Sequence, residues 1–237
     1  MIFPAIRPVR QRFARLTSFL RKHALAVLLT AGLPVVFTGC GTLNVDDAAK
    51  SPALKGDAIA VFVLRTENHF KPWNPEAEIL YVDEGVGNKG DESRYLFDFP
   101  QLESKNSFAE YVVSMRLRPG RYTLDELDTS VSIPFVGAGR GTIPLQETFN
   151  VAAGHYYYLG RISAHLREIT SKSDLPAGGV IPIIPQKVSG CADGTFDVAI
   201  EDKYAEDASL VARSYPAMRG VKLEKMLLPP WNRPTRR

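Results

Sequence analysis

The stretch AIAVFVL at residues 58–64 decides the fold class of this 237-residue chain. It is an unbroken apolar run bounded by Asp57 and Arg65, and it is shorter than the roughly 10 residues that a helix needs. Successive side chains of a strand point to opposite faces, so both faces of this strand are apolar. A strand of this kind is expected in the centre of a sheet that is covered on both sides. We therefore predict a β-sandwich built around it.

Short apolar runs after this stretch predict further strands, at 79–82, 95–99, 111–117, 122–127, 148–151, 155–162, 195–200 and 221–227. In RPGR at 118–121, Pro119 fixes φ at the first corner of a turn and Gly120 tolerates positive φ at the second. This predicts a hairpin between the two flanking strands. AAG at 152–154 predicts a second such pair, and the glycine-rich stretch at 85–91 predicts a hairpin with a long loop.

One helix is predicted near the C-terminus. Asp202 is a suitable N-cap for a helix over 203–213, on which Tyr204, Ala208 and Val211 share one face, and Pro216 prevents the helix from continuing. The domain extends over residues 57–228, a length that fits one hydrophobic core. The fold prediction is therefore mainly β, a single β-sandwich with one short C-terminal helix.

Two motifs resemble known families. LRPGRYTL at 117–124 resembles the hairpin of transthyretin-like and carboxypeptidase-regulatory-like β-sandwiches. VAAGHYYYLG at 151–160 is similar to a segment of small, uncharacterised bacterial envelope lipoproteins. The resemblance implies an immunoglobulin-like or transthyretin-like sandwich. It implies no particular chemistry, because function depends on the site and not on the fold.

The first 39 residues have the composition of a secretory signal. Six cations and no acid precede an uncharged apolar run at 24–38, which Pro34 interrupts. This run of 15 residues is shorter than the roughly 20 that span a bilayer as a helix. The ending FTGC at 37–40 resembles the lipobox of bacterial lipoproteins, which implies cleavage before Cys40 and attachment of lipid to its thiol. An ordinary cleaved signal and a signal anchor are the alternatives.

Lipidation of Cys40 would place the protein in the cell envelope. By the same resemblance, Gly41 favours the periplasmic face of the outer membrane. Residues 40–56 lack apolar periodicity and predict a flexible tether. Loss of six cations with the signal leaves 23 Lys and Arg against 26 Asp and Glu, so the mature chain has a net charge of −3. A nucleic-acid partner is therefore not expected.

The basic tail at 229–237 is predicted to be disordered, with contact to lipid headgroups or peptidoglycan as the alternative. GAGRGT at 137–142 lacks the lysine of a phosphate-binding loop and is predicted to be a mobile loop. Residues 156–158 are three tyrosines that alternate between the faces of a strand. They are predicted to pack in the core, with a stacking platform for a sugar or a partner as the alternative.

The remaining polar residues form no recognisable catalytic motif. His69, His155 and His165 lack metal-site spacing, so no metal or cofactor is predicted. Cys191 is predicted to be a buried, inert thiol, because Cys40 is the only other cysteine. Solvated positions are predicted for three acid pairs, Asp83-Glu84, Asp91-Glu92 and Glu206-Asp207.

The candidate docking segment is GVIPIIPQ at 179–186. Branched apolar residues alternate with prolines that interrupt ladder hydrogen bonds, which indicates an edge strand or an extended arm. Such an arm either covers its own core or is exposed as a docking surface. In the second case the predicted partner-binding residues are Ile181, Ile183, Ile184 and Trp73.

Two functions remain open from the sequence. The favoured one is a membrane-anchored, non-enzymatic envelope lipoprotein whose sandwich docks a protein or a cell-wall partner. The alternative is a periplasmic hydrolase whose site is formed by sequence-distant residues such as His155, His165 and Asp174. The two hypotheses differ in whether these side chains converge in space.

Overall fold

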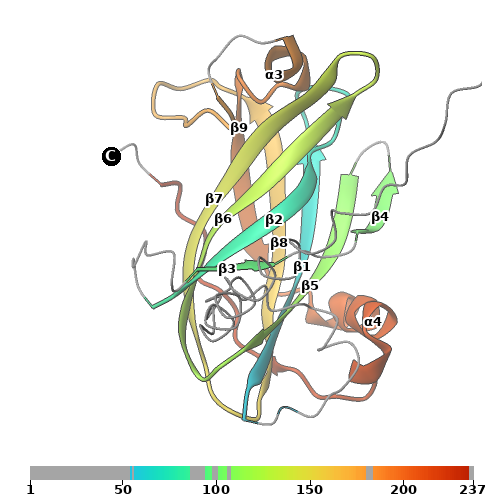
Figure 1. The fold of residues 1–237 in the computed structure, drawn as a ribbon, viewed down its shortest axis with the longest axis vertical. Helices are drawn as coiled ribbons and strands as arrows, with labels where there is room; N and C mark the ends of the chain where they lie inside the picture. The colour runs from blue at the N-terminus through green and yellow to red at the C-terminus, as the bar shows by residue number, and fades with distance from the viewer. Residues whose placement is uncertain are drawn as a thin grey trace, which may run out of the picture. The chain divides into compact units, whose positions relative to one another are not determined.

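The structure is a computed structural model, which describes residues 54, 56–85, 94–97, 101–105, 108–179 and 184–234. These residues form two β-sheets and few helices (Figure 1). The prediction of a mainly β sandwich is confirmed. Within the described ranges, no helix is long and apolar enough to cross a membrane.

The larger sheet has six strands, in the order β10-β8-β1-β5-β4 with β9 also paired to β8. Their bounds are β1 (Ala58–Asn68), β4 (Gln101–Lys105), β5 (Phe108–Leu117), β8 (Tyr156–Glu168), β9 (Gly194–Glu201) and β10 (Glu224–Lys225). The smaller sheet has the order β3-β2-β6-β7. Its bounds are β2 (Glu76–Glu84), β3 (Arg94–Phe97), β6 (Gly120–Ile133) and β7 (Gly137–Val151).

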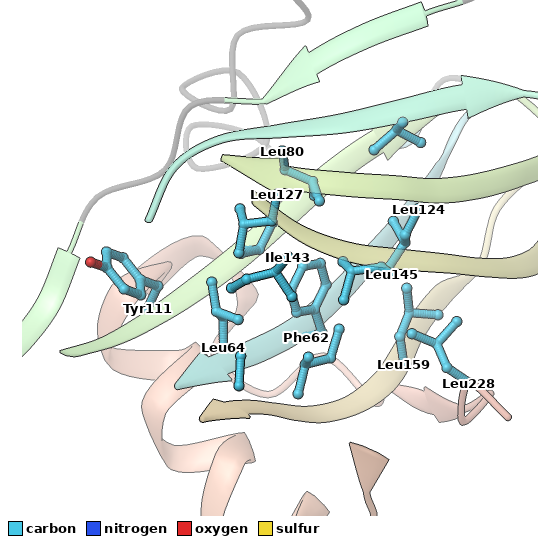
Figure 2. Close-up of a cluster of buried hydrophobic side chains, with 14 of the residues drawn as sticks. Phe62, Leu64, Leu80, Tyr111, Leu124, Leu127, Ile143, Leu145, Leu159 and Leu228 are labelled. Carbon is cyan, nitrogen blue, oxygen red and sulfur yellow. The ribbon is translucent and has the colours of Figure 1, made fainter. Parts of the chain in front are cut away.

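Strand β1 is buried on both faces, as its sequence predicts. Its inward side chains, among them Phe62 and Leu64, meet side chains of the smaller sheet such as Leu124 and Ile143 (Figure 2). Its outward side chains pack beneath the helix α4 (Tyr204–Ser214) and the 3-10 helix η2 (Pro216–Met218). Each fully buried side chain of this size contributes about 1.5–3 kcal/mol, so the two cores anchor β1 in the centre of the sheet.

The predicted hairpin at 118–121 is wrong. Strand β5 pairs with β1 and β4 in the larger sheet, whereas β6 pairs with β2 and β7 in the smaller one. The turn therefore carries the chain from one sheet to the other. The hydroxyl of Tyr122 donates a hydrogen bond to the carbonyl of Arg118 at 3.0 Å, which fixes this crossing in the manner of a tyrosine corner.

The predicted pair around 152–154 is also wrong, because β7 and β8 belong to different sheets. The long hairpin is instead β6–β7, which turns at residues 134–136 and pairs from Ile133↔Gly137 to Gly120↔Val151. The stretch 137–142, predicted to be a mobile loop, is thus the first part of β7. By contrast, the predicted pairing of 79–82 with 95–99 is confirmed by the β2–β3 ladder.

The helices differ from the single one predicted. The C-terminal helix is confirmed as α4, but its N-cap is Lys203 and not Asp202 as predicted; Asp202 Oδ1 still accepts a hydrogen bond from the Tyr204 backbone N–H at 3.2 Å. A further short helix, α3 (Ile184–Ser189), begins inside the stretch predicted to be an edge strand or arm. That prediction is wrong for residues 184–186. Of the strand predicted at 221–227, only β10 forms.

The signal at 1–39, Cys40 and most of the tether at 40–56 lie outside the described residues. Near the end of the predicted tether, Leu54 is buried against the outer core beneath α4.

Candidate functional site

Large apolar side chains are exposed at one end of the sandwich. We call this set the apolar tip, and it comprises Phe135 and Val136 in the β6–β7 turn with Ile184 and Val188 in α3. Among the described residues these are four of the five large apolar side chains that are exposed, and the fifth is Leu227. Phe135 is fully exposed and Ile184 is 70% exposed. Their concentration at one end marks a candidate interaction surface.

Small residues in β7 allow α3 to lie at this end. A Cβ at Gly139 would come within 2.5 Å of the Ser189 Cβ, and one at Gly137 would lie 3.5 Å from Pro185 Cγ. Figure 1 shows α3 beside the end of the β6–β7 hairpin. Phe135 has a φ of 64°, which is rare for a bulky residue, so the turn holds its ring outward at a cost in backbone strain.

The sequence segments around the tip contain no acidic residues. The stretches 69–75, 129–146 and 175–192 contain no Asp or Glu, and they carry the cations Lys71, Arg140 and Lys187. Arg140 and Lys187 are exposed. These cations flank the tip, and the acids Glu76 and Asp193 follow two of the stretches directly.

The residues predicted to bind a partner have different positions. Ile184 belongs to the apolar tip. Trp73 is half-buried and packs against the inner core, and its carbonyl accepts a hydrogen bond from Asn68 Nδ2 at 2.6 Å. Ile181 and Ile183 lie outside the described residues. Phe135, Val136 and Val188 were not predicted from the sequence, although IPFVG at 133–137 is an apolar turn and an unusual sequence for one.

A second cluster lies on the outer face of the larger sheet, where β1 ends. Glu67 and His165 are register partners on the parallel strands β1 and β8, and His69 follows β1. His69 Nε2 lies 2.8 Å from Glu67 Oε2, and His165 Nδ1 lies 3.2 Å from the same oxygen. The imidazole rings stack with centroids 4.7 Å apart. Three possible metal-ligand atoms thus lie within 4.8 Å of one another.

Arg65 also contacts this cluster, through Glu67. Its Nε donates to Glu67 Oε1 at 2.6 Å, so one carboxylate oxygen faces Arg65 and the other faces the histidines. Burial favours the neutral form of Glu67, but hydrogen bonds from His69 and Arg65 and the charges of Arg65 and His165 outweigh it and lower the Glu67 pKa. His165 Nδ1 is buried and makes no hydrogen bond among the described residues, although it lies 3.2 Å from Glu67 Oε2.

The residues of the hydrolase hypothesis do not converge. His155 precedes His165 by ten positions on the same stretch of strand, so the two are roughly 30 Å apart. His155 Nδ1 pairs with Glu224 Oε1 at 2.8 Å. Asp174 is held by Arg167, whose Nη1 donates to Asp174 Oδ2 at 2.9 Å. His155 is therefore remote from the other two residues, while Asp174 is engaged by Arg167, two positions after His165 on β8.

Other predicted sites have structural roles. Tyr158 is buried beneath α4, Tyr157 packs partly against the inner core, and Tyr156 packs partly against the outer one, as the alternation predicts. Cys191 is a fully buried free thiol, and burial raises its pKa. The prediction of solvated acids is wrong for Asp83 and Asp207, which are both buried.

The tail predicted to be disordered makes specific contacts as far as Arg233. Trp231 Nε1 donates to the Pro144 carbonyl at 2.9 Å, and Arg233 Nη1 donates to Thr195 Oγ1 at 2.6 Å and pairs with Asp197. A cavity of about 330 Å³ lies beside these contacts, with Pro144, Phe196 and Arg233 in its wall. The prediction of a disordered tail is therefore wrong for Trp231 and Arg233.

Comparison with protein-family models, with curated proteins and with solved structures finds no match for this chain.

Proposed function

We propose that this chain is a lipid-anchored lipoprotein of the bacterial envelope, and that its β-sandwich is a non-enzymatic module that binds an anionic lipid surface through the apolar tip. Cys40 is the proposed attachment point, at the periplasmic face of the outer membrane. The observation that carries the proposal is the gathering of exposed apolar side chains at one end of the sandwich, beside the exposed cations Arg140 and Lys187. The roughly 30 Å between His155 and His165 argues against the three-residue hydrolase site and supports a non-enzymatic role.

A lipid surface suits this tip better than a protein partner does. A standard protein complex buries roughly 800 Å² of each partner, drawn from about 20–30 residues, whereas the tip has four exposed apolar side chains. A few apolar side chains flanked by cations are sufficient for an interfacial membrane contact, because each cation near an anionic surface adds about 1 kcal/mol. Phe135 can enter the interface while Arg140 and Lys187 meet the headgroups.

The start of β1, which the predicted tether precedes, and the tip lie at opposite ends of the sandwich. Ala58 pairs with Leu117, close to the start of β6, whereas the tip follows the far end of that 14-residue strand. At roughly 3.3 Å per residue, β6 spans about 45 Å. Because Leu54 is buried beneath α4, only residues 40–53 can serve as the tether, and these 14 residues reach about 45 Å when fully extended. The tip can therefore contact the bilayer that holds the Cys40 lipid when the tether is close to full extension.

Anchoring is tested by substitution of Cys40. We expect the full chain to sediment with membranes and to yield an N-terminal peptide whose mass includes an acylated cysteine. The variant Cys40→Ser should lose this modification. An unmodified thiol at Cys40, or a retained leader, contradicts the anchoring half of the proposal.

The tip is tested with lipid vesicles and the chain that begins at Gly41, which contains every described residue. We expect co-sedimentation with vesicles of phosphatidylglycerol and phosphatidylcholine, weaker binding at high salt, and little binding to phosphatidylcholine alone. Phe135→Asp should reduce binding at least about tenfold, because it removes the most exposed apolar side chain and adds a repelled charge. Leu227→Asp is the matched control, since Leu227 is exposed but lies outside the tip. Equal effects of the two substitutions contradict the tip assignment.

A further inference from the structure

We propose that Glu67, His69 and His165 bind one divalent transition-metal ion of the zinc class, a site that is independent of membrane anchoring. The ligand atoms are Glu67 Oε2, His69 Nε2 and His165 Nδ1. Two imidazoles and one carboxylate form a ligand set that occurs in zinc proteins, where solvent or a substrate takes the remaining position.

The distances are close to those that a bound ion requires. Zinc bonds of about 2.0–2.1 Å to nitrogen and oxygen place neighbouring ligand atoms of a tetrahedral site about 3.3 Å apart. Glu67 Oε2 already lies 2.8 Å from His69 Nε2 and 3.2 Å from His165 Nδ1. Small side-chain rotations would therefore admit an ion without movement of the strands.

The sheet fixes two of the ligands and leaves the third adjustable. Glu67 and His165 are register partners on adjacent strands, so the pairing of β1 with β8 sets their separation. His69 follows the end of β1 and its side chain is 56% exposed, so it can close over an ion that arrives from solvent. The buried His165 Nδ1 makes no hydrogen bond among the described residues, so it can coordinate an ion held beside the Glu67 carboxylate that it faces.

The neighbouring cation orients the carboxylate. Arg65 Nε donates to Glu67 Oε1, which turns Oε2 toward the two histidines. Hydrogen bonds of this kind to a ligating carboxylate are common around metal sites, where they hold the ligand in position. The positive charge of Arg65 opposes that of the ion, so we expect an affinity in the micromolar range and not that of a structural zinc finger.

The test uses the full chain, purified in detergent and stripped with a chelator. Calorimetric titration with Zn²⁺ should show one equivalent bound with release of protons, and Co²⁺ should give visible absorption bands. His165→Ala and Glu67→Gln should each weaken binding at least about tenfold. His69→Ala, at an exposed position beyond the strand, serves in place of His165→Ala if that variant does not fold.

The matched control is His155→Ala. His155 also lies 2.8 Å from a carboxylate, that of Glu224, but no third ligand group lies beside that pair among the described residues. We expect this variant to bind Zn²⁺ as the unmodified chain does. Absence of saturable binding in the unmodified chain, or an equal loss in His155→Ala and His165→Ala, would overturn the proposal.

Discussion

Asp207 shows what a single side chain does beneath α4. It is fully buried, and it accepts hydrogen bonds from the Tyr158 hydroxyl at 2.6 Å and from Arg161 Nε at 2.9 Å. Burial and the hydrogen bond to Asp207 raise the pKa of Tyr158. The phenol is therefore a donor at every physiological pH, and the carboxylate joins β8 to α4.

We expect Asp207→Ala to lower the free energy of unfolding by about 3–5 kcal/mol, because it leaves Arg161 in a largely buried position without its partner. The measurement is urea denaturation followed by circular dichroism. Glu206→Ala is the control, since Glu206 also faces Arg161, at 3.4 Å, but its side chain is 65% exposed. Its loss should cost no more than about 1 kcal/mol. A similar loss of unfolding free energy in both variants would show that the Arg161–Asp207 ion pair is not buried in solution.

Asp174 makes stability depend on pH. Hydrogen bonds from Arg167, and then from the backbone N–H groups of Thr170 and Ser171, hold the pKa of Asp174 well below its usual range against the opposing effect of burial. A lowered folded-state pKa adds stability above the unfolded value of about 3.9, and this stability is lost as pH falls below it. The difference in Tm between the unmodified chain and Asp174→Asn should be constant from about pH 7 to 5 and should shrink below about pH 4. A difference that is unchanged at pH 3 contradicts this role.

At the level of elements, α3 depends on a glycine of β7. We expect Gly139→Ala to destabilise the packing of α3 by about 1–3 kcal/mol, because the added methyl group would overlap Ser189 and the Pro185 carbonyl. Vesicle binding through the tip should weaken with it, since Ile184 and Val188 lie on α3. Gly179→Ala is the control, because its Cβ would meet only Gln186 Nε2 at 3.8 Å. Faster hydrogen exchange over 184–189 in Gly139→Ala alone is the expected readout.

The sequence predicts where strands lie better than it predicts which strands pair. Apolar runs place β2, β5 and β9 within about three residues and give the starts of β1 and β8, but they end β1 four residues and β8 six residues too early. RPGR at 118–121 reverses the direction of the chain, but such a turn does not by itself place both flanking strands in the same sheet. The partner of β5 is instead β1, which ends 40 positions before β5 begins and pairs with it along most of its length. The glycines at 137–141 suggest a loop by composition, while in the fold Gly137 and Gly139 make room for α3.

The metal site and the apolar tip are each formed by residues that are far apart in the sequence, so sequence patterns do not reveal them. Glu67 and His165 are 98 positions apart and meet only because β1 and β8 pair in parallel. Likewise, the apolar tip joins a turn at 134–136 to a helix that begins at Ile184. Only Ile184 of the tip could be predicted, from its place in a proline-interrupted apolar run. Motifs with a fixed spacing along the sequence therefore cannot predict either site.

The C-terminal residues act as a clamp between the two sheets. Trp231 donates to Pro144 on β7 of the smaller sheet, and Arg233 binds Thr195 and Asp197 on β9 of the larger one. A chain that ends at Pro230 loses these hydrogen bonds and exposes the cavity beside them. At about 1 kcal/mol for each net hydrogen bond, we expect the free energy of unfolding to fall by about 2–3 kcal/mol. A chain that ends at Pro234 lacks Arg236 and Arg237 but keeps the clamp, so its urea midpoint should equal that of the full chain. If both truncated chains lose the same stability, the basic charge and not the clamp is responsible. If neither chain loses stability, the two sheets are held together without the tail.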